Sequence, residues 1–243
     1  MRVAPVLGVR WREATELVKI IAIGGGGFTH GTDPDLDDFV LAQSSVQNPR
    51  IGYIGTANSD LPERIDRFYT RFASCGVTTS HLRESATGND AAEWVAGQDM
   101  IYVGGGNTKH LLDSWHQSGI DRLLVDAAKS GTLLAGVSAG AVCWFEFAFS
   151  NYSEAGFLPV KGLSLVPGSC CPHYSTEPDR RPAFTAAISN GDLPGGLAID
   201  DGVAVFFDGS APARAFSTRD GASARFVRRS RKGFVIQPIA AMD

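Results

Sequence analysis

The chain has 243 residues, of which 44% are hydrophobic, 20% are charged and 28 are glycine, a composition that excludes a disordered or fibrous protein. Its length fits one large α/β domain and no segment resembles a linker, so we predict a single domain over residues 1–243, with residues 1–16 as an N-terminal extension. The net charge of -4 argues against a nucleic acid or an anionic membrane as partner.

Targeting signals and metal-binding patterns are also missing from the sequence. There is no apolar run of about 18 residues and no apolar signal core, which predicts a cytoplasmic protein. The cysteines, Cys75, Cys143, Cys170 and Cys171, do not form the spacing of a metal site, even together with His173. We therefore expect reduced thiols, no metal and no cofactor.

Strands and helices alternate through the first half of the chain. Residues 18–23 form a short apolar run that ends in four glycines, Gly24 to Gly27, as expected of a buried parallel strand that enters a loop. The glycines lack the pattern of a phosphate-binding loop, so we interpret them as positions where the backbone comes close to other groups. The same reasoning predicts strands at 51–55, 77–82 and 100–103 and helices at 33–43 and 60–75.

Two further helices, at 108–117 and 120–130, precede an apolar strand at 133–136. After residue 196 the pattern changes to short runs separated by Asp-Gly pairs, which indicates antiparallel strands, and the basic stretch 225–232 indicates a solvated hairpin. We predict an α/β fold: a three-layer αβα sandwich around a doubly wound, mostly parallel sheet, with a C-terminal antiparallel extension. Ligands are expected at the carboxyl ends of its strands.

The segment Gly136-Val137-Ser138-Ala139-Gly140 lies at such a strand end. A serine on a sharp strand-to-helix turn, between glycines, is typical of a nucleophile elbow. The N–H group of Ala139 would then point toward the same space and could stabilise an oxyanion. Because the pattern is short, an ordinary turn with a helix-capping serine remains an alternative.

A serine nucleophile requires a base, and His173 is the histidine that follows the elbow, at the expected end of an apolar segment. It lies 35 residues beyond Ser138, whereas the base of an α/β-hydrolase lies near the C-terminus. The spacing therefore argues against that fold.

Three motifs, in their order, resemble the serine peptidase family of dipeptidase E and cyanophycinase, relatives of the class I glutamine amidotransferase fold. They are Val103-Gly104-Gly105-Gly106-Asn107-Thr108, Gly136-Val137-Ser138-Ala139-Gly140-Ala141 and Pro172-His173-Tyr174. The resemblance covers residues 18–208. It implies that Ser138 is the nucleophile, His173 the general base, and the amides of Gly106 and Ala139 the oxyanion hole.

The resemblance also places the third member of the triad between the serine and the histidine, about four helical turns of sequence beyond the serine, and Glu154 is the carboxylate nearest to that position. Glu146 would lie on the elbow helix and Glu177 follows the histidine, so we select Glu154. Asn107 either shapes the glycine turn and the substrate site or caps the next helix.

Dipeptidase E prefers an N-terminal aspartate, and a guanidinium group suits a carboxylate, so Arg180 and Arg181 are candidate substrate-binding residues. The alternative is that they are exposed charges at the start of a helix.

We thus expect a cofactor-free serine peptidase, an aspartyl dipeptidase with a Ser-His-Glu triad that acts on small peptides. A cyanophycinase-like β-aspartyl peptidase and a non-hydrolytic protein that binds a small ligand remain open. Glutamine amidotransfer is disfavoured because Cys143 lies off the elbow. A homodimer is left open.

Overall fold

The computed structural model describes residues 18–153, 156–209 and 211–239, so the predicted N-terminal extension lies outside the described residues. The strands are β1 (Lys19–Ile23), β2 (Arg50–Ile54), β3 (Thr78–Leu82), β4 (Met100–Val103), β5 (Leu133–Val137), β6 (Phe145–Ser153), β7 (Gly156–Lys161), β8 (Val166–Cys171), β9 (Gly196–Ile199), β10 (Val203–Asp208), β11 (Ala211–Ser217), β12 (Ala224–Ser230) and β13 (Gly233–Pro238). The helices are α1 (Asp35–Ala42), the 3-10 turn η1 (Thr56–Asn58), α2 (Pro62–Phe72), α3 (Gly88–Ala96), α4 (Thr108–Ser118), α5 (Ile120–Lys129), α6 (Ala139–Val142) and α7 (Arg180–Asn190).

The first sheet has the strand order β11-β10-β1-β5-β4-β2-β3. Its members β1, β5, β4, β2 and β3 run parallel, and β10 and β11 extend it in the antiparallel direction, which confirms the predicted fold class. The register pairs Val137 with Ile23 and Gly136 with Val103. The carboxyl ends of β1, β4 and β5 therefore meet at one edge, where ligands were expected.

A second sheet, with the order β13-β12-β9-β8-β6-β7, was not anticipated from the sequence. Strand β9 pairs with β8 and β12 rather than with β10, so the C-terminal strands are divided between the two sheets. Strands β6 and β7 and helix α3 were also missed. The predicted basic hairpin is confirmed as β12 and β13, joined by a turn between Ser230 and Gly233.

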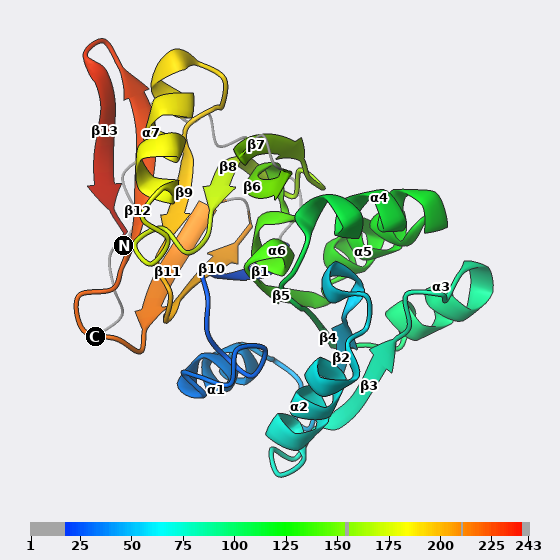
Figure 1. The fold of residues 1–243 in the computed structure, drawn as a ribbon. Helices are drawn as coiled ribbons and strands as arrows, with labels where there is room; N and C mark the ends of the chain where they lie inside the picture. The colour runs from blue at the N-terminus through cyan, green and yellow to red at the C-terminus, as the bar shows by residue number, and fades with distance from the viewer. Residues whose placement is uncertain (1–17, 154–155, 210, 240–243) are drawn as a thin grey trace.

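Helices cover both faces of the first sheet. Successive strand residues point to opposite faces, and because both sets are apolar, both faces are buried. Ile21 and Ile23 pack in a cluster with α1 and α2, whereas Ile20 and Ala22 pack in the cluster that includes α3, α4 and α5. Figure 1 shows α1 and α2 apart from α4 and α5, with strands between them.

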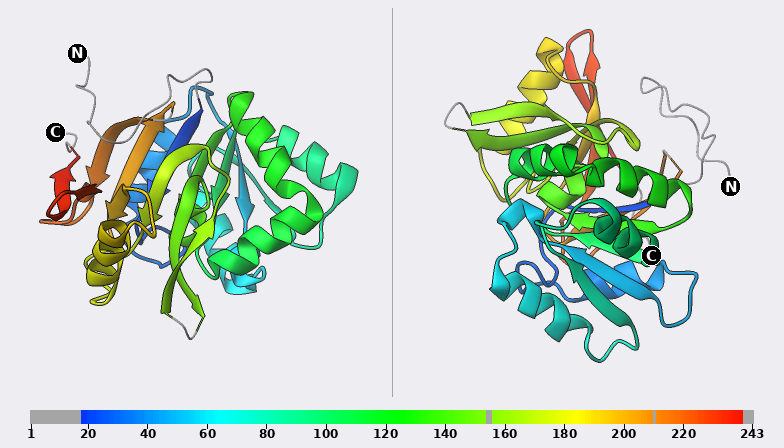
Figure 2. Two further views of the ribbon diagram at one scale, coloured as in Figure 1. Left: turned by 90° about the horizontal axis from the view of Figure 1, so that it is seen from above. Right: turned by 90° about the vertical axis from the view of Figure 1, so that its right-hand side faces the viewer.

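The second sheet shares the core of the first. Phe145, Val166, Leu197 and Phe226 lie in the same buried cluster as α4 and α5, and α7 covers the other face of this sheet through Phe184. Seen from above, α7 and the C-terminal strands occupy one end of the molecule and helices α3 to α5 the other (Figure 2). Within the described ranges, no helix combines the length and hydrophobicity needed to cross a bilayer.

A buried carboxylate holds the glycine-rich loop after β1. Asp37 is fully buried and accepts the Phe28 N–H at 2.9 Å and the Arg71 Nε–H at 3.2 Å, and the Tyr102 hydroxyl lies 3.5 Å away. Burial raises the pKa of Asp37 to about 7, although Arg71 and the Phe28 amide act in the opposite direction. The folded state therefore binds a proton at Asp37 that the unfolded state releases at lower pH.

Because the folded state binds this extra proton, the free energy of unfolding falls as pH rises from the pKa of Asp37 in the unfolded chain to its folded value of about 7. As pH rises from 5 to 8, we expect the free energy of unfolding of the wild type to fall by about 2 to 3 kcal/mol more than that of the neutral variant Asp37→Asn, because only the wild type must ionise a buried group. Urea unfolding of both proteins at the two pH values measures this difference. If the two proteins differ in free energy of unfolding by the same amount at both pH values, the ion pair with Arg71 keeps Asp37 ionised throughout.

Candidate active site

Ser138 stands on a strained turn directly after β5. Its φ of 55° and ψ of -114° are rare for a residue with a side chain, and such strain is typical of functional turns. The glycines on either side are required, since a Cβ on Gly136 would lie 2.0 Å from the Gly140 oxygen and one on Gly140 would lie 2.2 Å from the Val103 oxygen. The Ser138 N–H donates to the Ile23 oxygen at 3.0 Å. The predicted elbow geometry is therefore present.

His173 reaches Ser138 from the second sheet. It lies just beyond β8 with a φ of 51°, and its Nε2 is 2.8 Å from the Ser138 Oγ. Its side chain is 13% exposed, so the imidazole can still exchange protons with a ligand. At this distance Nε2 can accept the hydroxyl proton, which is the step that turns a serine into a nucleophile.

Asp201 completes the hydrogen-bonded chain. Its Oδ1 lies 2.6 Å from the His173 Nδ1, so the ring nitrogen that faces away from Ser138 is oriented by a carboxylate. Burial alone would raise the pKa of Asp201, but the hydrogen bond and charge of His173, together with Thr176 and Arg219, outweigh burial and hold that pKa below its usual value. The carboxylate is therefore charged where an imidazolium would form.

The loop after β1 leaves space for this pair. A Cβ on Gly25 would lie 2.0 Å from the Asp201 Oδ1 and 2.8 Å from the His173 Cε1, and the Gly202 N–H donates to the Gly25 oxygen at 2.8 Å. The glycines that follow β1 thus let the backbone come close to other groups, as the sequence suggested. The groups in contact with it are the His173 imidazole and the Asp201 carboxylate.

Asp201 occupies the position for which the sequence pointed to Glu154. Glu154 lies outside the described residues, and Asp201 was not considered. The only signal in the sequence is that Asp200 and Asp201 directly follow a short apolar run, which the structure shows as the buried strand β9. The parallel pairing of β9 with β8, which brings Asp201 next to His173, is visible only in the structure. In the sequence alone, the pair Asp201-Gly202 indicates a turn.

The second predicted oxyanion donor lies on the neighbouring turn. A Cβ on Gly105 would be 3.2 Å from the Ser138 Cβ, so the turn after β4 lies against the elbow. Gly106 has a φ of 152°, and a Cβ there would lie 2.1 Å from the Ala57 oxygen. Side-chain and backbone bonds hold this turn: the Asn58 amide donates to the Gly105 oxygen at 3.1 Å, and the Asn107 N–H to the Ala57 oxygen at 2.7 Å. Ala139 begins α6, so its N–H has no partner within that helix.

Ser138 and His173 open into a cavity of about 410 Å³, whose wall includes Gly106 and Arg180. Asn107 and Arg181 do not line this cavity, although both were predicted to bind substrate. Asn107 instead caps α4, where its Oδ1 accepts the His110 N–H at 3.0 Å, and Arg181 is exposed in the first turn of α7. For both, the alternative left open by the sequence is the one observed.

Arg180 lines the cavity, but its guanidinium is already paired. Its Nε donates to Glu177 Oε2 at 2.7 Å and its Nη2 to Glu177 Oε1 at 3.1 Å, while Nη1 lies 3.4 Å from the Phe149 oxygen. The two-point pair neutralises Glu177 and leaves Arg180 little capacity for a further carboxylate.

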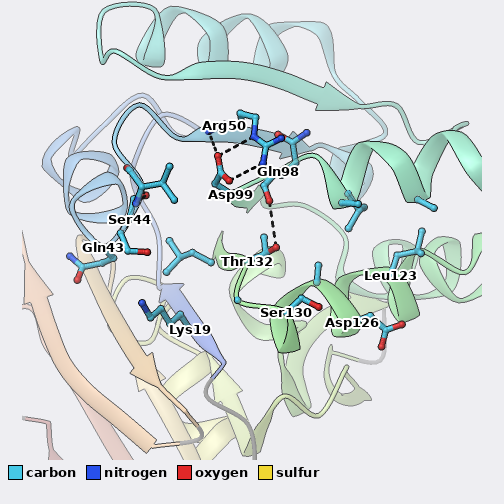
Figure 3. A pocket seen from close by; sticks show the side chains of 18 residues that line it. Lys19, Gln43, Ser44, Arg50, Gln98, Asp99, Leu123, Asp126, Ser130 and Thr132 are labelled. Carbon is cyan, nitrogen blue, oxygen red and sulfur yellow. Dashed lines mark hydrogen bonds and ion pairs between the residues drawn. The ribbon is translucent and has the colours of Figure 1, made fainter.

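A different cavity, of about 590 Å³, opens at the amino ends of the first sheet's strands (Figure 3). Arg50 and Asp99 form an ion pair there at 2.9 Å, and Thr132 lies 3.5 Å from the Gln98 oxygen. Its described lining residues include no histidine or cysteine. Since ligands of α/β sheets bind at the carboxyl ends, the Ser138 cavity is the better candidate.

The cysteines are free thiols, as predicted, and Cys143, Cys170 and Cys171 are buried. Burial raises the pKa of Cys143 and Cys170 well above its usual value, so neither is a reactive thiolate. In the part of the chain that the structure describes, no group of histidine, cysteine and acidic side chains could hold a metal ion.

The chain is similar to known peptidases over most of its length. Residues 20–213 match the model of peptidase family S51. The uncharacterized peptidase YgaJ of Bacillus subtilis is 43% identical over 210 residues, which cover 85% of this chain and 90% of that protein. Peptidase E of Streptomyces coelicolor is 27% identical over 136 residues, which cover 54% of this chain and 53% of that protein.

The fold is also found among solved structures. The crystal structure of a peptidase from an acI-B1 Actinobacterium superimposes with a TM-score of 0.69 at 18% identity, covering 94% of this chain and 96% of that one. At this identity the likeness establishes the fold alone. The family match over most of the chain and the 43% identical relative show that the chain belongs to peptidase family S51 and is a serine peptidase of the peptidase E type.

Proposed function

We propose that the protein is an aspartyl dipeptidase that uses Ser138, His173 and Asp201 as its catalytic triad. The observation that carries the proposal is the continuous chain of two short hydrogen bonds, 2.8 Å from Ser138 to His173 and 2.6 Å from His173 to Asp201, at the edge of a cavity. The sequence-based Ser-His-Glu triad is replaced by one that ends in aspartate.

In this mechanism the Ser138 Oγ attacks the carbonyl carbon of the peptide bond while the His173 Nε2 takes the hydroxyl proton. The amides of Gly106 and Ala139 donate to the oxyanion of the tetrahedral intermediate. His173 then gives its proton to the leaving amine, and a water molecule, activated by His173, hydrolyses the acyl-enzyme. Asp201 stays ionised and stabilises the imidazolium in both halves of the reaction.

The size of the cavity and the resemblance to dipeptidase E support a small substrate with an N-terminal aspartate. A volume of about 410 Å³ accommodates a dipeptide-sized molecule, and basic side chains in the wall suit a carboxylate. A cyanophycinase-like β-aspartyl peptidase would use the same triad and is tested with β-linked Asp-Leu. A cytoplasmic location and a homodimer stay predictions from the sequence.

Removal of the nucleophile tests the function itself. We expect Ser138→Ala to lower kcat for Asp-Leu by more than about 10⁴-fold without loss of binding, because His173 then has no hydroxyl to activate. Steady-state hydrolysis of Asp-Leu and its β-linked isomer, together with calorimetric binding to the variant, measures both effects. If neither protein cleaves any peptide while both bind acidic ligands, the protein is a binding protein and the proposal fails.

The identity of the acid is tested by two neutral substitutions. We expect Asp201→Asn to lower kcat by about 10³- to 10⁴-fold, since an amide cannot stabilise the imidazolium and favours the wrong tautomer. The matched control Glu154→Gln should change kcat by less than about threefold, because the proposed triad assigns the acid role to Asp201. The reverse order of effects would return the acid role to Glu154.

Gly25 offers a test of the space around the pair. In Gly25→Ala the new methyl group would overlap the Asp201 Oδ1 and must displace that carboxylate from His173. We expect kcat to fall by about 100-fold, while the free energy of unfolding changes by about 1 kcal/mol or less because the obstructing atom belongs to a side chain. Paired kinetic and urea-unfolding measurements check this. Full activity in the variant would contradict the positioning of Asp201 described above.

A further inference from the structure

The catalytic cavity has two arginines in its wall, Arg64 and Arg180, together with His30 and Glu177. The sequence pointed to Arg180 as the group that binds a substrate carboxylate. In the structure Arg180 makes a two-point pair with Glu177 and its side chain is 6% exposed. A substrate carboxylate would have to displace Glu177, so Arg180 is better suited to shaping the wall.

Arg64 differs from Arg180 in both pairing and exposure. It lies in the first turn of α2, and its Nε is 3.9 Å from Glu63 Oε1, beyond hydrogen-bonding distance. No other side-chain partner of Arg64 is found among the described residues, and its side chain is 26% exposed. Its guanidinium therefore has donors available for a ligand in the cavity.

His30 does not compete for this role. Burial lowers the pKa of His30, and the charges of His173 and Arg64 lower it further, against a hydrogen bond to the Gly26 oxygen. The imidazole is thus held neutral close to Arg64 and to the His173 ring, whose centroid is 5.9 Å from its own. Glu177 and Arg180 neutralise each other. The positive charge of Arg64 therefore has no counterion within the described wall of the cavity.

We propose, on the basis of the serine peptidase function, that Arg64 binds a carboxylate of the substrate in the Ser138 cavity. In a dipeptide this carboxylate is either the side chain of the N-terminal residue or the C-terminal carboxylate of the molecule. Both would accept two parallel N–H donors from the guanidinium, the geometry that favours arginine at such sites.

The experiment compares Arg64→Met, Arg64→Lys and the wild type on four substrates: Asp-Leu, Asn-Leu, Asp-Leu amide and Asn-Leu amide. Arg67→Met is the matched control, because Arg67 lies one turn further along α2, is exposed and does not line this cavity. We expect Arg64→Met to lower kcat/KM for Asp-Leu at least tenfold, Arg64→Lys to retain part of it, and Arg67→Met to lie within about twofold of the wild type.

The pattern across substrates identifies the carboxylate. If the loss with Arg64→Met is absent for Asn-Leu but present for Asp-Leu amide, Arg64 binds the aspartate side chain; the opposite pattern assigns it to the C-terminal carboxylate. An equal loss for all four substrates, or no loss for any, would overturn the proposal, since neither depends on a carboxylate.

A binding measurement separates this inference from the proposed function. Calorimetry with Asp-Leu on Ser138→Ala and on Ser138→Ala with Arg64→Met needs no turnover. If the wild type cleaves no peptide but only the protein with Arg64 binds Asp-Leu, the function fails and the role of Arg64 stands. Equal binding to both proteins, or binding to neither, refutes the role of Arg64 even where hydrolysis is observed.

Discussion

The close packing of backbones at the carboxyl ends of β1, β4 and β5 is the constraint on which the site depends. The absence of a Cβ on Gly136 and Gly140 lets Gly136 lie against the Gly140 carbonyl and Gly140 against the Val103 carbonyl. The Ser138 N–H donates to the oxygen of Ile23. These contacts hold Ser138 in a conformation that a residue with a side chain rarely adopts. The strain is balanced by the buried apolar strands on either side, so the hydroxyl is presented by a rigid support.

The residues of the proposed triad and oxyanion hole are divided between the two sheets. The first sheet supplies Ser138 and the turns that carry Gly106 and Gly25, whereas His173 and Asp201 follow β8 and β9 of the second sheet. The common core of Phe145, Val166 and Leu197 with α4 and α5 brings the two halves together. Packing that is remote from the chemistry therefore determines distances within the triad.

Features with a local pattern could be predicted from the sequence. The buried strands, the glycine turns and the elbow at Ser138 depend on residues within a few positions, and His173 was found by its place after a strand. Asp201 could not be found in this way, because its role depends on the parallel pairing of β8 with β9, which no local pattern encodes. The same limit explains Arg180: its position beside the site was predictable, but its pairing with Glu177 was not.

Because the proposed nucleophile and base lie on different sheets, the pair can form only late in the folding of the chain. Ser138 is synthesised before His173 and Asp201, and it gains a base only when the second sheet has docked on the first. A nascent or partly unfolded chain therefore carries an unactivated hydroxyl. In the proposed mechanism, hydrolytic competence is therefore a property of the completed tertiary structure, since Ser138 and His173 meet only there.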